Sequence, residues 1–231
     1  MKTLNEILEL HKVFNDRFGF SVGYAQQGSA EWFKAKLGVV SASNASKVVA
    51  KKDSETRATY MAELIAQVCT GQMEEINSKY LDWGHQHEDA ARSSYEFMKR
   101  SGVVEQVPFV FQDERFRVGC SPDGFFKDVD GYRGVEIKCP FNPANYVKFA
   151  LDDKIKPEYV WQYQFSLWVT EAETWDFVQY HPAMRKNPIK VLTVHRDEEK
   201  MKAFEDLVPA FINDMDTQLS KLGVEFGEQW K

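Results

Sequence analysis

Cysteine is scarce in this sequence. Three of its 231 residues are cysteines, Cys69, Cys120 and Cys139, and no two of them form a C-x-x-C pair. An odd, widely spaced set excludes the disulfide framework of a small secreted domain and offers no ligand pairs for structural zinc. We therefore expect three reduced thiols in the protein core.

The chain also lacks a long apolar run. No stretch approaches the roughly 18 consecutive apolar residues of a membrane span. The N-terminal sequence MKTLNEILELHKVF alternates charged and apolar residues and has no apolar signal-peptide segment. These features predict a cytoplasmic protein without a membrane association, beginning with a short amphipathic helix.

Basic residues are in the minority. The 29 Lys and Arg residues stand against 35 Asp and Glu, which gives a formal net charge of −6. Because phosphate binding depends mostly on lysine and arginine, this balance alone points away from nucleic acid. It does not exclude a nucleic-acid enzyme, since a basic channel can coexist with an acidic exterior and a carboxylate-rich metal centre.

Repeats, low-complexity runs and flexible linkers are missing, which favours one domain over residues 1–231. The spacing of apolar residues predicts helices over residues 4–16, 31–37, 59–69, 81–99, 157–170 and 201–219. Another short helix would run through Val48 and Val49, capped by Ser41 or Ser43. β-Branched and aromatic residues predict strands over residues 103–111, 116–120, 132–140, 174–180 and 190–195, with a hairpin turn near Asp128 and Gly131. The expected fold class is α/β or α+β, with helices flanking a central mixed sheet.

Two carboxylates and a lysine come close together in the predicted hairpin. Asp123 lies in the turn SPDG directly after one strand, and Glu136 and Lys138 lie on the next strand. Side chains alternate along a strand, so Glu136 and Lys138 share one face at a spacing of about 6.6 Å, while their apolar neighbours take the other. The hairpin would bring Asp123 beside Glu136.

This arrangement suits a hard divalent cation with a lysine alongside. Mg²⁺ takes one or two protein carboxylates, keeps several waters and completes its shell with substrate phosphate. It would polarise a scissile phosphate, and Lys138 would position or deprotonate the attacking water. A second ion would need another carboxylate. Glu88 is a candidate because it shares a helix face with Gly84, Ala91 and Tyr95, where a carboxylate is costly to bury without a cation.

The same residues allow a plainer interpretation. A Glu and a Lys two positions apart on a hairpin often form only a surface ion pair, and short motifs match by chance. His85 and His87 suggest no alternative centre, because imidazoles two residues apart on a helix point to different faces. The chain contains neither a G-x-S-x-G nucleophile elbow nor a G-x₄-GKS phosphate loop.

Several segments taken together resemble the lambda-type phage exonucleases. They are WGHQHEDAAR (83–92), CSPDG (120–124), EIKCPF (136–141) and QYQFSLWVT (162–170), in this order. The similarity extends from QQGSAEWFKAKLGVVSAS (26–43) through AELIAQVCTG (62–71) to FGEQWK (226–231), leaving about 25 N-terminal residues as a helical extension. The resemblance implies a restriction-endonuclease-like PD-(D/E)xK core and a bacterial or prophage member of the family.

The resemblance also implies a metal site. Glu88, Asp123, Glu136 and the backbone carbonyl of Ile137 would hold two Mg²⁺ ions, for which Mn²⁺ could substitute. Lys138 would be the catalytic lysine. Gln162 matches a family position near the catalytic centre, whereas its sequence context alone suggests a helical residue facing water.

Other positions match the DNA contacts of the family. Lys36, Ser41 and Ser43 match a pocket for the 5′-phosphate of the digested strand, although the residues alone would make the serines helix caps. Leu81 matches an apolar residue that wedges between the strands at the fork, with Lys79 nearby. From its chemistry alone, Leu81 would be assigned to the core.

Two positions depart from the family pattern. The phosphate pocket of the lambda enzyme has an arginine where this chain has Lys36, and a second basic position after the CPF motif is Ala144 here. Lysine neutralises a phosphate as a point charge, without the bidentate fork of arginine. We therefore expect a weaker dependence on a 5′-phosphate, or one carried by other residues.

A member of this family would digest one strand of linear double-stranded DNA processively in the 5′→3′ direction, giving mononucleotides and a 3′-tailed strand. A homotrimer ring around the DNA would explain processivity, and a single-strand annealing recombinase would receive the tail. Two alternatives remain open. One is an endonuclease of the same fold, and the other is a non-catalytic module that binds DNA ends.

Overall fold

The computed structural model describes residues 1–22, 25–73, 79–100, 103–128 and 131–231, without the side chains of Leu81 and Asp128. The helices are α1 (Leu4–Phe18), α2 (Ala30–Ala35), α3 (Ala45–Val48), α4 (Glu55–Thr70), α5 (Lys79–Lys99), α6 (Pro143–Asp152), α7 (Pro157–Thr170) and α8 (Glu198–Lys221), with short 3-10 helices η2 (Ala42–Asn44) and η3 (Glu228–Trp230). The strands are β1 (Val40–Ser41), β2 (Val104–Glu105), β3 (Val110–Phe111), β4 (Val118–Cys120), β5 (Gly124–Asp128), β6 (Gly131–Lys138), β7 (Thr174–Tyr180) and β8 (Ile189–His195). None of the described helices combines the length and the apolar character needed to cross a membrane.

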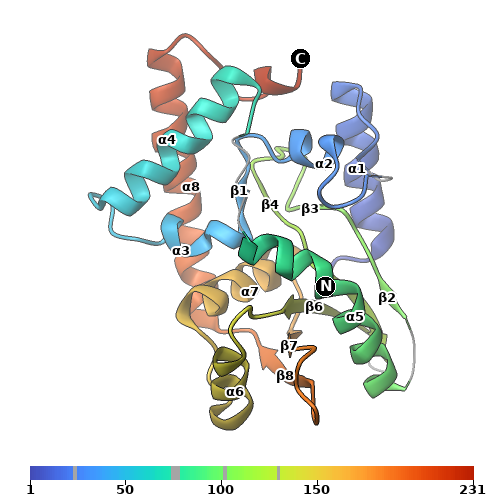
Figure 1. Ribbon diagram of the computed structural model, residues 1–231. Coiled ribbons are helices and arrows are strands. Elements are labelled where there is room, and N and C mark those ends of the chain that lie inside the picture. Colours follow the sequence, from blue (N-terminus) through green and yellow to red (C-terminus); the bar gives the residue numbers. More distant parts are fainter. Residues whose placement is uncertain (23–24, 74–78, 101–102, 129–130) are drawn as a thin grey trace.

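The strands form two mixed sheets (Figure 1). The larger has the order β2-β5-β6-β7-β8, with β6 and β7 parallel and the other neighbours antiparallel. The smaller has the order β1-β4-β3, with β1 and β4 parallel. Since β4 belongs to one sheet and β5 to the other, the chain crosses between the sheets at residues 121–123.

Local signals account for where the main helices begin and end. The Thr3 side chain accepts a hydrogen bond from the Glu6 backbone, and the Glu6 carboxylate accepts one from the Thr3 backbone, which makes a capping box for α1. Ser54 caps α4, which ends at Gly71 with a left-handed φ of 65°. Pro157 occupies the first position of α7, where its missing N–H has no helical partner to lose.

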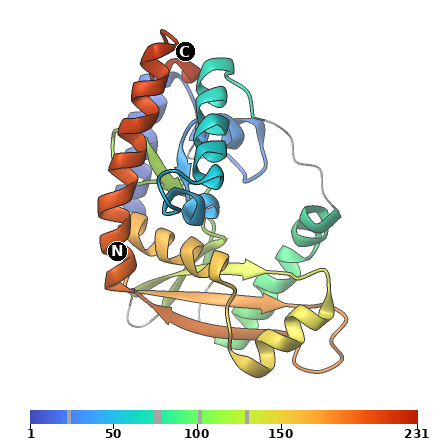
Figure 2. The same cartoon turned by 90° about the vertical axis from the view of Figure 1, so that its left-hand side faces the viewer.

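The helices cover both faces of the larger sheet. Ala91 and Tyr95 of α5 pack against Val135 and Ile137 of β6 in one cluster, and α7 and α6 lie over the opposite face (Figure 2). The long helix α8 runs beside α4 (Figures 1 and 2). Residues of β6 therefore alternate between α5 and α7, as the period of two predicts, and Glu136 faces α7.

The expected class, a mixed sheet flanked by helices, is confirmed, and several details are wrong. The strand expected over residues 103–111 is two separate strands, β2 and β3, in different sheets, and Pro108 between them cannot donate to a ladder. Helix α6 has no counterpart among the predicted elements. Ser41 and Ser43 make no capping hydrogen bond to a helix backbone. Cys69 is exposed, because it lies on the outer side of α4.

Candidate active site

Asp123 lies where the chain leaves the smaller sheet. Its backbone N–H donates to the Val135 carbonyl at 3.1 Å, which continues the β5–β6 ladder by one residue. The next residue must be glycine. Gly124 has a φ of +153°, and a Cβ atom there would lie 2.1 Å from Val104 Cγ1 of β2. A larger residue would push β2 away and displace Asp123.

Glu136 and Lys138 project from β6 toward α7. Lys138 Nζ donates to Glu136 Oε1 at 2.5 Å, and Gln162 Nε2 of α7 donates to the same oxygen at 2.7 Å. Glu136 is only 2% exposed. A buried carboxylate needs such partners, so these contacts explain why three of the predicted residues are found together.

The Asp123 carboxylate lies across from them. Its Oδ2 accepts a hydrogen bond from the Ile137 backbone N–H at 2.5 Å. Burial raises the pKa of Asp123 well above its usual range, and the charges of Glu136 and Glu88 add to this effect, while Lys138 opposes it. The site thus holds more negative charge than its own lysine neutralises, a condition that a bound cation would relieve.

Lys138 remains charged in this environment. Burial would lower its pKa, but the carboxylates of Glu136 and Asp123 outweigh burial and raise the pKa above the ordinary lysine value. The ammonium also lies 5.1 Å from the centroid of the Tyr159 ring. At neutral pH Lys138 is therefore a cation and not a free base.

Glu88 approaches the centre from α5. Arg92, one helical turn further on, donates through Nη2 to Glu88 Oε1 at 2.6 Å and through Nη1 to Asp89 Oδ1 at 2.7 Å. The Arg92 side chain is 10% exposed, whereas Asp89 is 94% exposed. Of the two carboxylates, Glu88 is the one that faces the interior.

A buried anchor holds α5 on the sheet. Asp176 of β7 is fully buried, accepts hydrogen bonds from Tyr95 and Thr193 at 2.7 Å each, and pairs with Lys99 at 2.7 Å. Burial alone would raise the pKa of Asp176, but the hydrogen bonds from Lys99, Thr193 and Tyr95 hold it below its usual value. This ion pair fixes the register of α5 and so the position of Glu88.

A cavity of about 810 Å³ opens beside these groups. Glu88, Asp123 and Lys138 line it, and so do Lys148 of α6 and Lys156 just before α7. The carboxylates thus share one cavity with several cations. This charge pattern suits a phosphodiester substrate that binds together with a metal ion.

The residues expected at the phosphate pocket do not line this cavity. Ser41 lies in β1 of the smaller sheet, Ser43 lies in η2, and Lys36 directly follows α2. Ser41 Oγ is 3.3 Å from Ser43 Oγ, and Lys36 Nζ is 3.5 Å from the centroid of the Trp32 ring. Trp32 Nε1 in turn donates to Ser121 Oγ at 3.2 Å, two residues before Asp123. Burial lowers the pKa of Lys36 to about 7, with a small opposing effect from Cys120.

The remaining predicted contacts lie at the start of α5. Lys79 Nζ is 5.3 Å from the Tyr80 ring centroid and 5.6 Å from that of Phe141, and both rings line the cavity. Leu81 belongs to the same turn, but its side chain lies outside the described residues, so the wedge stays a prediction. Ala144 lies in the first turn of α6.

The family described as the YqaJ-like viral recombinase domain matches residues 31–173, more than half of the chain. The chain belongs to this family. The expected membership of the lambda exonuclease group is thereby confirmed.

Individual relatives of this YqaJ-like domain agree with the assignment. The alkaline exonuclease LHK-Exo from Laribacter hongkongensis is 31% identical, with a TM-score of 0.76, or 0.75 in its complex with dAMP, over 84% of this chain and 96% of that one. A phage related exonuclease from Haemophilus somnus 129PT has a TM-score of 0.61 at 14% identity over 80% and 96% of the two chains, which shows the fold alone. The ExoD protein of Escherichia coli (strain K12) is 39% identical over 87 residues, 37% of this chain and all of that one.

The donor set of the YqaJ-like domain fits Mg²⁺. Within the described ranges, no three His, Cys, Asp or Glu side chains form a ready-made metal cluster. Asp123 and Glu136 nevertheless supply two carboxylates, which is all that Mg²⁺ requires from a protein when water and substrate phosphate complete its shell. A second ion would draw on Glu88, whose carboxylate is bound to Arg92 here.

Three residues at the site are absent from the sequence-based prediction. Arg92 follows Glu88 by four positions, and Ser121 lies within the CSPDG segment, so both could have been found from motifs already singled out. Gln179 has no sequence signal. It is 5% exposed, lines the cavity and lies beside Lys138 only because β6 and β7 pair in parallel.

Proposed function

We propose that this YqaJ-like domain is an Mg²⁺-dependent exonuclease. It would digest one strand of linear double-stranded DNA in the 5′→3′ direction to mononucleotides, leaving a 3′ single-stranded tail. The observation that carries the proposal is the convergence of Asp123, Glu136 and Lys138 beside a cavity that also contains several lysines. Family membership and the 31% identity to an alkaline exonuclease support it.

Lys138 would act on the substrate as a cation. The neighbouring carboxylates raise its pKa, so it keeps its proton at neutral and alkaline pH. It would donate to a phosphate oxygen and stabilise the charge that develops there in the transition state. Gln162 would act as a positioning residue, because it shares Glu136 Oε1 with the ammonium and limits where both groups can move.

Asp123, Glu136 and the backbone carbonyl of Ile137 would hold the first Mg²⁺, and Glu88 would contribute to a second site. Mn²⁺ would be an acceptable substitute. When bound, the metal polarises the scissile phosphate and lowers the pKa of a coordinated water. The chain orients its own ligands beforehand, since Ile137 N–H holds Asp123 and Gln162 holds Glu136.

The 5′-phosphate of the digested strand would bind around Lys36, Ser41 and Ser43. Ser121 and the Trp32 indole would complete this pocket, because their hydrogen bond connects it to the Asp123 turn. Lys36 lacks the two-pronged guanidinium of an arginine. Its pKa is low because burial disfavours the charged ammonium that would bind a phosphate. We therefore propose a weaker preference for 5′-phosphorylated ends than in the lambda enzyme.

We also propose, from the family resemblance, that three copies form a ring around DNA and pass the 3′ tail to a single-strand annealing recombinase. Lys79 and Leu81 would contact DNA near the fork. Sedimentation of the protein with and without a duplex would test the ring. A monomer under both conditions would contradict it.

The catalytic proposal is tested by digestion of a linear duplex with Mg²⁺, with EDTA and with the variant Lys138→Ala. We expect EDTA to stop digestion and the variant to lose more than about a hundredfold in rate, in line with the loss of one transition-state donor. Lys202→Ala, an exposed lysine of α8, is the matched control and should digest normally.

The two alternative functions give different results in the same assay. An endonuclease of this fold would also cut a covalently closed circular duplex, which an exonuclease leaves intact. A non-catalytic end-binding module would retain the duplex without digesting it under any condition. Undiminished digestion by Lys138→Ala would reject the mechanism.

A further inference from the structure

Two large aromatic side chains are exposed at the catalytic cavity. Tyr80, in the first turn of α5, is 60% exposed, and Phe141, three residues after Lys138, is 44% exposed. Their ring centroids lie 5.4 Å apart with the planes at 87°, and both rings line the cavity. Exposed apolar groups gathered beside a polar site usually mark a binding surface. We refer to Tyr80 and Phe141 as the aromatic pair.

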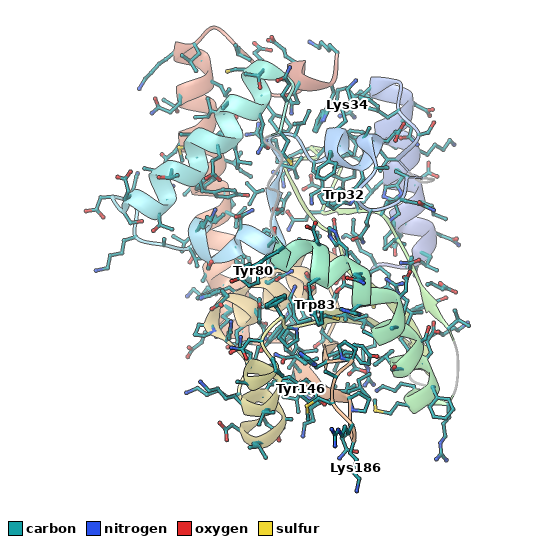
Figure 3. The ribbon with its side chains drawn as sticks, viewed as in Figure 1. Trp32, Lys34, Tyr80, Trp83, Tyr146 and Lys186 are labelled. Atoms are coloured by element: carbon teal, nitrogen blue, oxygen red, sulfur yellow. The ribbon has the colours of Figure 1, made fainter. Side chains whose placement is uncertain are left out.

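A third aromatic ring, that of Trp83, packs against the aromatic pair. The Trp83 ring packs edge-on against Phe141, with centroids 5.4 Å apart and planes at 76°. Tyr80 and Trp83 both lie near the start of α5 (Figure 3). Phe141 is thus held between two rings of one helix, and this arrangement orients it before any ligand arrives.

The charges around the aromatic pair identify the kind of ligand. Lys79 Nζ lies 5.3 and 5.6 Å from the two ring centroids. Lys148, Lys154 and Lys156 line the same cavity. Aromatic rings interleaved with cations are the usual surface for single-stranded nucleic acid, because the rings stack on bases while the cations bind the backbone.

The cavity connects the aromatic pair to the catalytic carboxylates along one side of α5. Tyr80, Gly84 and Glu88 follow one another at intervals of four residues and all line it. A Cβ atom at Gly84 would have no neighbour within 4 Å, so the space between the two ends is open. Eight helical residues span about 12 Å, the length of roughly three to four nucleotides at a rise of about 3.4 Å.

We propose that the aromatic pair stacks on an unpaired nucleobase of the DNA strand that enters the cavity, a few nucleotides from the bond that is cut. The cavity of about 810 Å³ has the size of a small-ligand site, so we expect a single unpaired strand to enter it and not a double helix. This assignment rests on the proposed nuclease function. Stacking of the aromatic pair on this base would help to keep the two DNA strands apart, in addition to the predicted wedge at Leu81.

The proposal is tested by placing 2-aminopurine, a fluorescent base quenched by stacking, at each of the first six positions of the 5′-ended strand of a duplex. Binding is measured in EDTA, where the metal-dependent reaction is blocked. With the wild-type protein, we expect a fluorescence change confined to one or two positions. Tyr80→Leu and Phe141→Leu should lose that change and bind about fivefold to a hundredfold more weakly, the range measured for the loss of one stacked base.

Two controls separate stacking from folding. Tyr80→Phe keeps the ring and should keep the position-specific change. Phe97→Leu replaces an aromatic residue of α5 that is 86% exposed and lies outside the cavity, and it should behave as wild type. Full retention of the signal in both Tyr80→Leu and Phe141→Leu would overturn the proposal, as would a wild-type protein with no position-specific change.

Digestion in Mg²⁺ by the same proteins distinguishes this inference from the proposed function. A protein that digests DNA without the 2-aminopurine change would overturn the stacking site alone. A protein that shows the change and its loss in the leucine variants, but digests nothing, would support the stacking site and overturn the nuclease.

Discussion

At the scale of single residues, Asp123 carries a charge that lowers the stability of the metal-free fold and that a bound cation would neutralise. Its carboxylate is partly buried at the edge of the cavity and faces the charges of Glu136 and Glu88. Burial and these two charges raise its pKa. When the pKa of an acid is higher in the folded state than in the unfolded state, its ionisation lowers the stability of the fold. The loss begins as the pH rises above the unfolded-state pKa and is complete once the pH exceeds the folded-state pKa. A divalent cation would remove the penalty by neutralising the charge.

The variant Asp123→Asn should therefore separate stability from activity. The amide oxygen can still accept the Ile137 N–H, while the charge repulsion disappears. We expect a higher Tm than wild type in EDTA at pH 8. Mg²⁺ should raise the Tm of wild type and not that of the variant, and digestion should fall by more than the 10–100-fold typical of residues that only orient a ligand.

Thermal unfolding with and without Mg²⁺ measures both effects. Asp206→Asn, at an exposed position of α8, is the control for removal of a negative charge. A Tm several degrees below wild type in EDTA would contradict the account, because it would mean that the Asp123 charge stabilises the metal-free fold.

Lys36 is the corresponding case for a positive charge, because burial disfavours its ammonium as it disfavours the Asp123 carboxylate. Its folded pKa of about 7 lies below the ordinary value of 10.5 because burial disfavours the ammonium. The protonated form is thus penalised in the fold. The penalty is complete below pH 7, fades as the pH rises toward 10.5, and is absent above that value. The Trp32 ring at 3.5 Å offsets part of it.

We expect Lys36→Met to stabilise the protein by about 1–3 kcal/mol at pH 6, the range for relieving an unpaired buried polar group, and by less at pH 9.5. Urea unfolding at the two pH values measures the difference. Lys34→Met, at an exposed lysine in the last turn of the preceding helix α2, should change stability little at either pH.

The preference of wild type for 5′-phosphorylated over 5′-hydroxyl ends should also be larger at pH 6.5 than at pH 9. A strong preference that does not change with pH would contradict this view of the pocket.

At the scale of elements, β6 and α7 were the most predictable parts of the site. The alternation of apolar and charged residues on β6 predicts that Glu136 and Lys138 share a face, and the hydrogen bond between the two side chains confirms it. Gln162 of α7 donates to the same Glu136 oxygen. The contact itself was not predictable from spacing, because it depends on how α7 packs on the sheet. Only the family resemblance indicated Gln162.

Other elements could not be derived from local pattern. The segment around Pro108 looks like one strand, since its residues have strand propensities, but tertiary pairing divides it between two sheets. The register of β6 against β7 brings Gln179 beside Lys138, and no local feature sets that register. The anchor between Asp176 and Lys99 likewise joins residues 77 positions apart in the chain.

Helix α1 allows a test of the domain organisation. We propose that the whole chain forms one domain, with α1 as part of its core. Phe14 is fully buried, and its ring lies 4.9 Å from the rings of both Phe111 and Trp230. His11 Nε2 also lies 2.5 Å from the Phe109 carbonyl oxygen. The extension is thus packed against residues from the middle and the end of the sequence.

Phe14→Ala should lower the free energy of unfolding by about 3–5 kcal/mol, the usual result of emptying a buried phenylalanine site. Urea unfolding should still show one cooperative transition. Leu8→Ala, on the outer side of the same helix where the side chain is 50% exposed, is the control and should have a much smaller effect. A second transition, or no loss of stability, would contradict the proposal that α1 belongs to the domain.

At the scale of the whole molecule, the candidate site lies at the junction of the two sheets. β4 and β5 belong to different sheets, and Asp123 occupies the short connection between them. The larger sheet supplies Glu136 and Lys138, and α5 supplies Glu88. The residues of the proposed phosphate pocket come from β1, from η2 and from the end of α2. An enzyme of net charge −6 can act on DNA because lysines are present in the cavity where the phosphates would pass.

We propose that this centre removes nucleotides from the 5′ end of one strand. Time-resolved digestion of a linear duplex, with one strand labelled at its 5′ end or at its 3′ end, tests it most directly. We expect the 5′ label to be released first, as a mononucleotide, while the 3′ label remains on a steadily shortening strand, and we expect no reaction in EDTA. Early release of the 3′ label, or cutting of a closed circular duplex, would contradict the proposed 5′→3′ exonuclease activity.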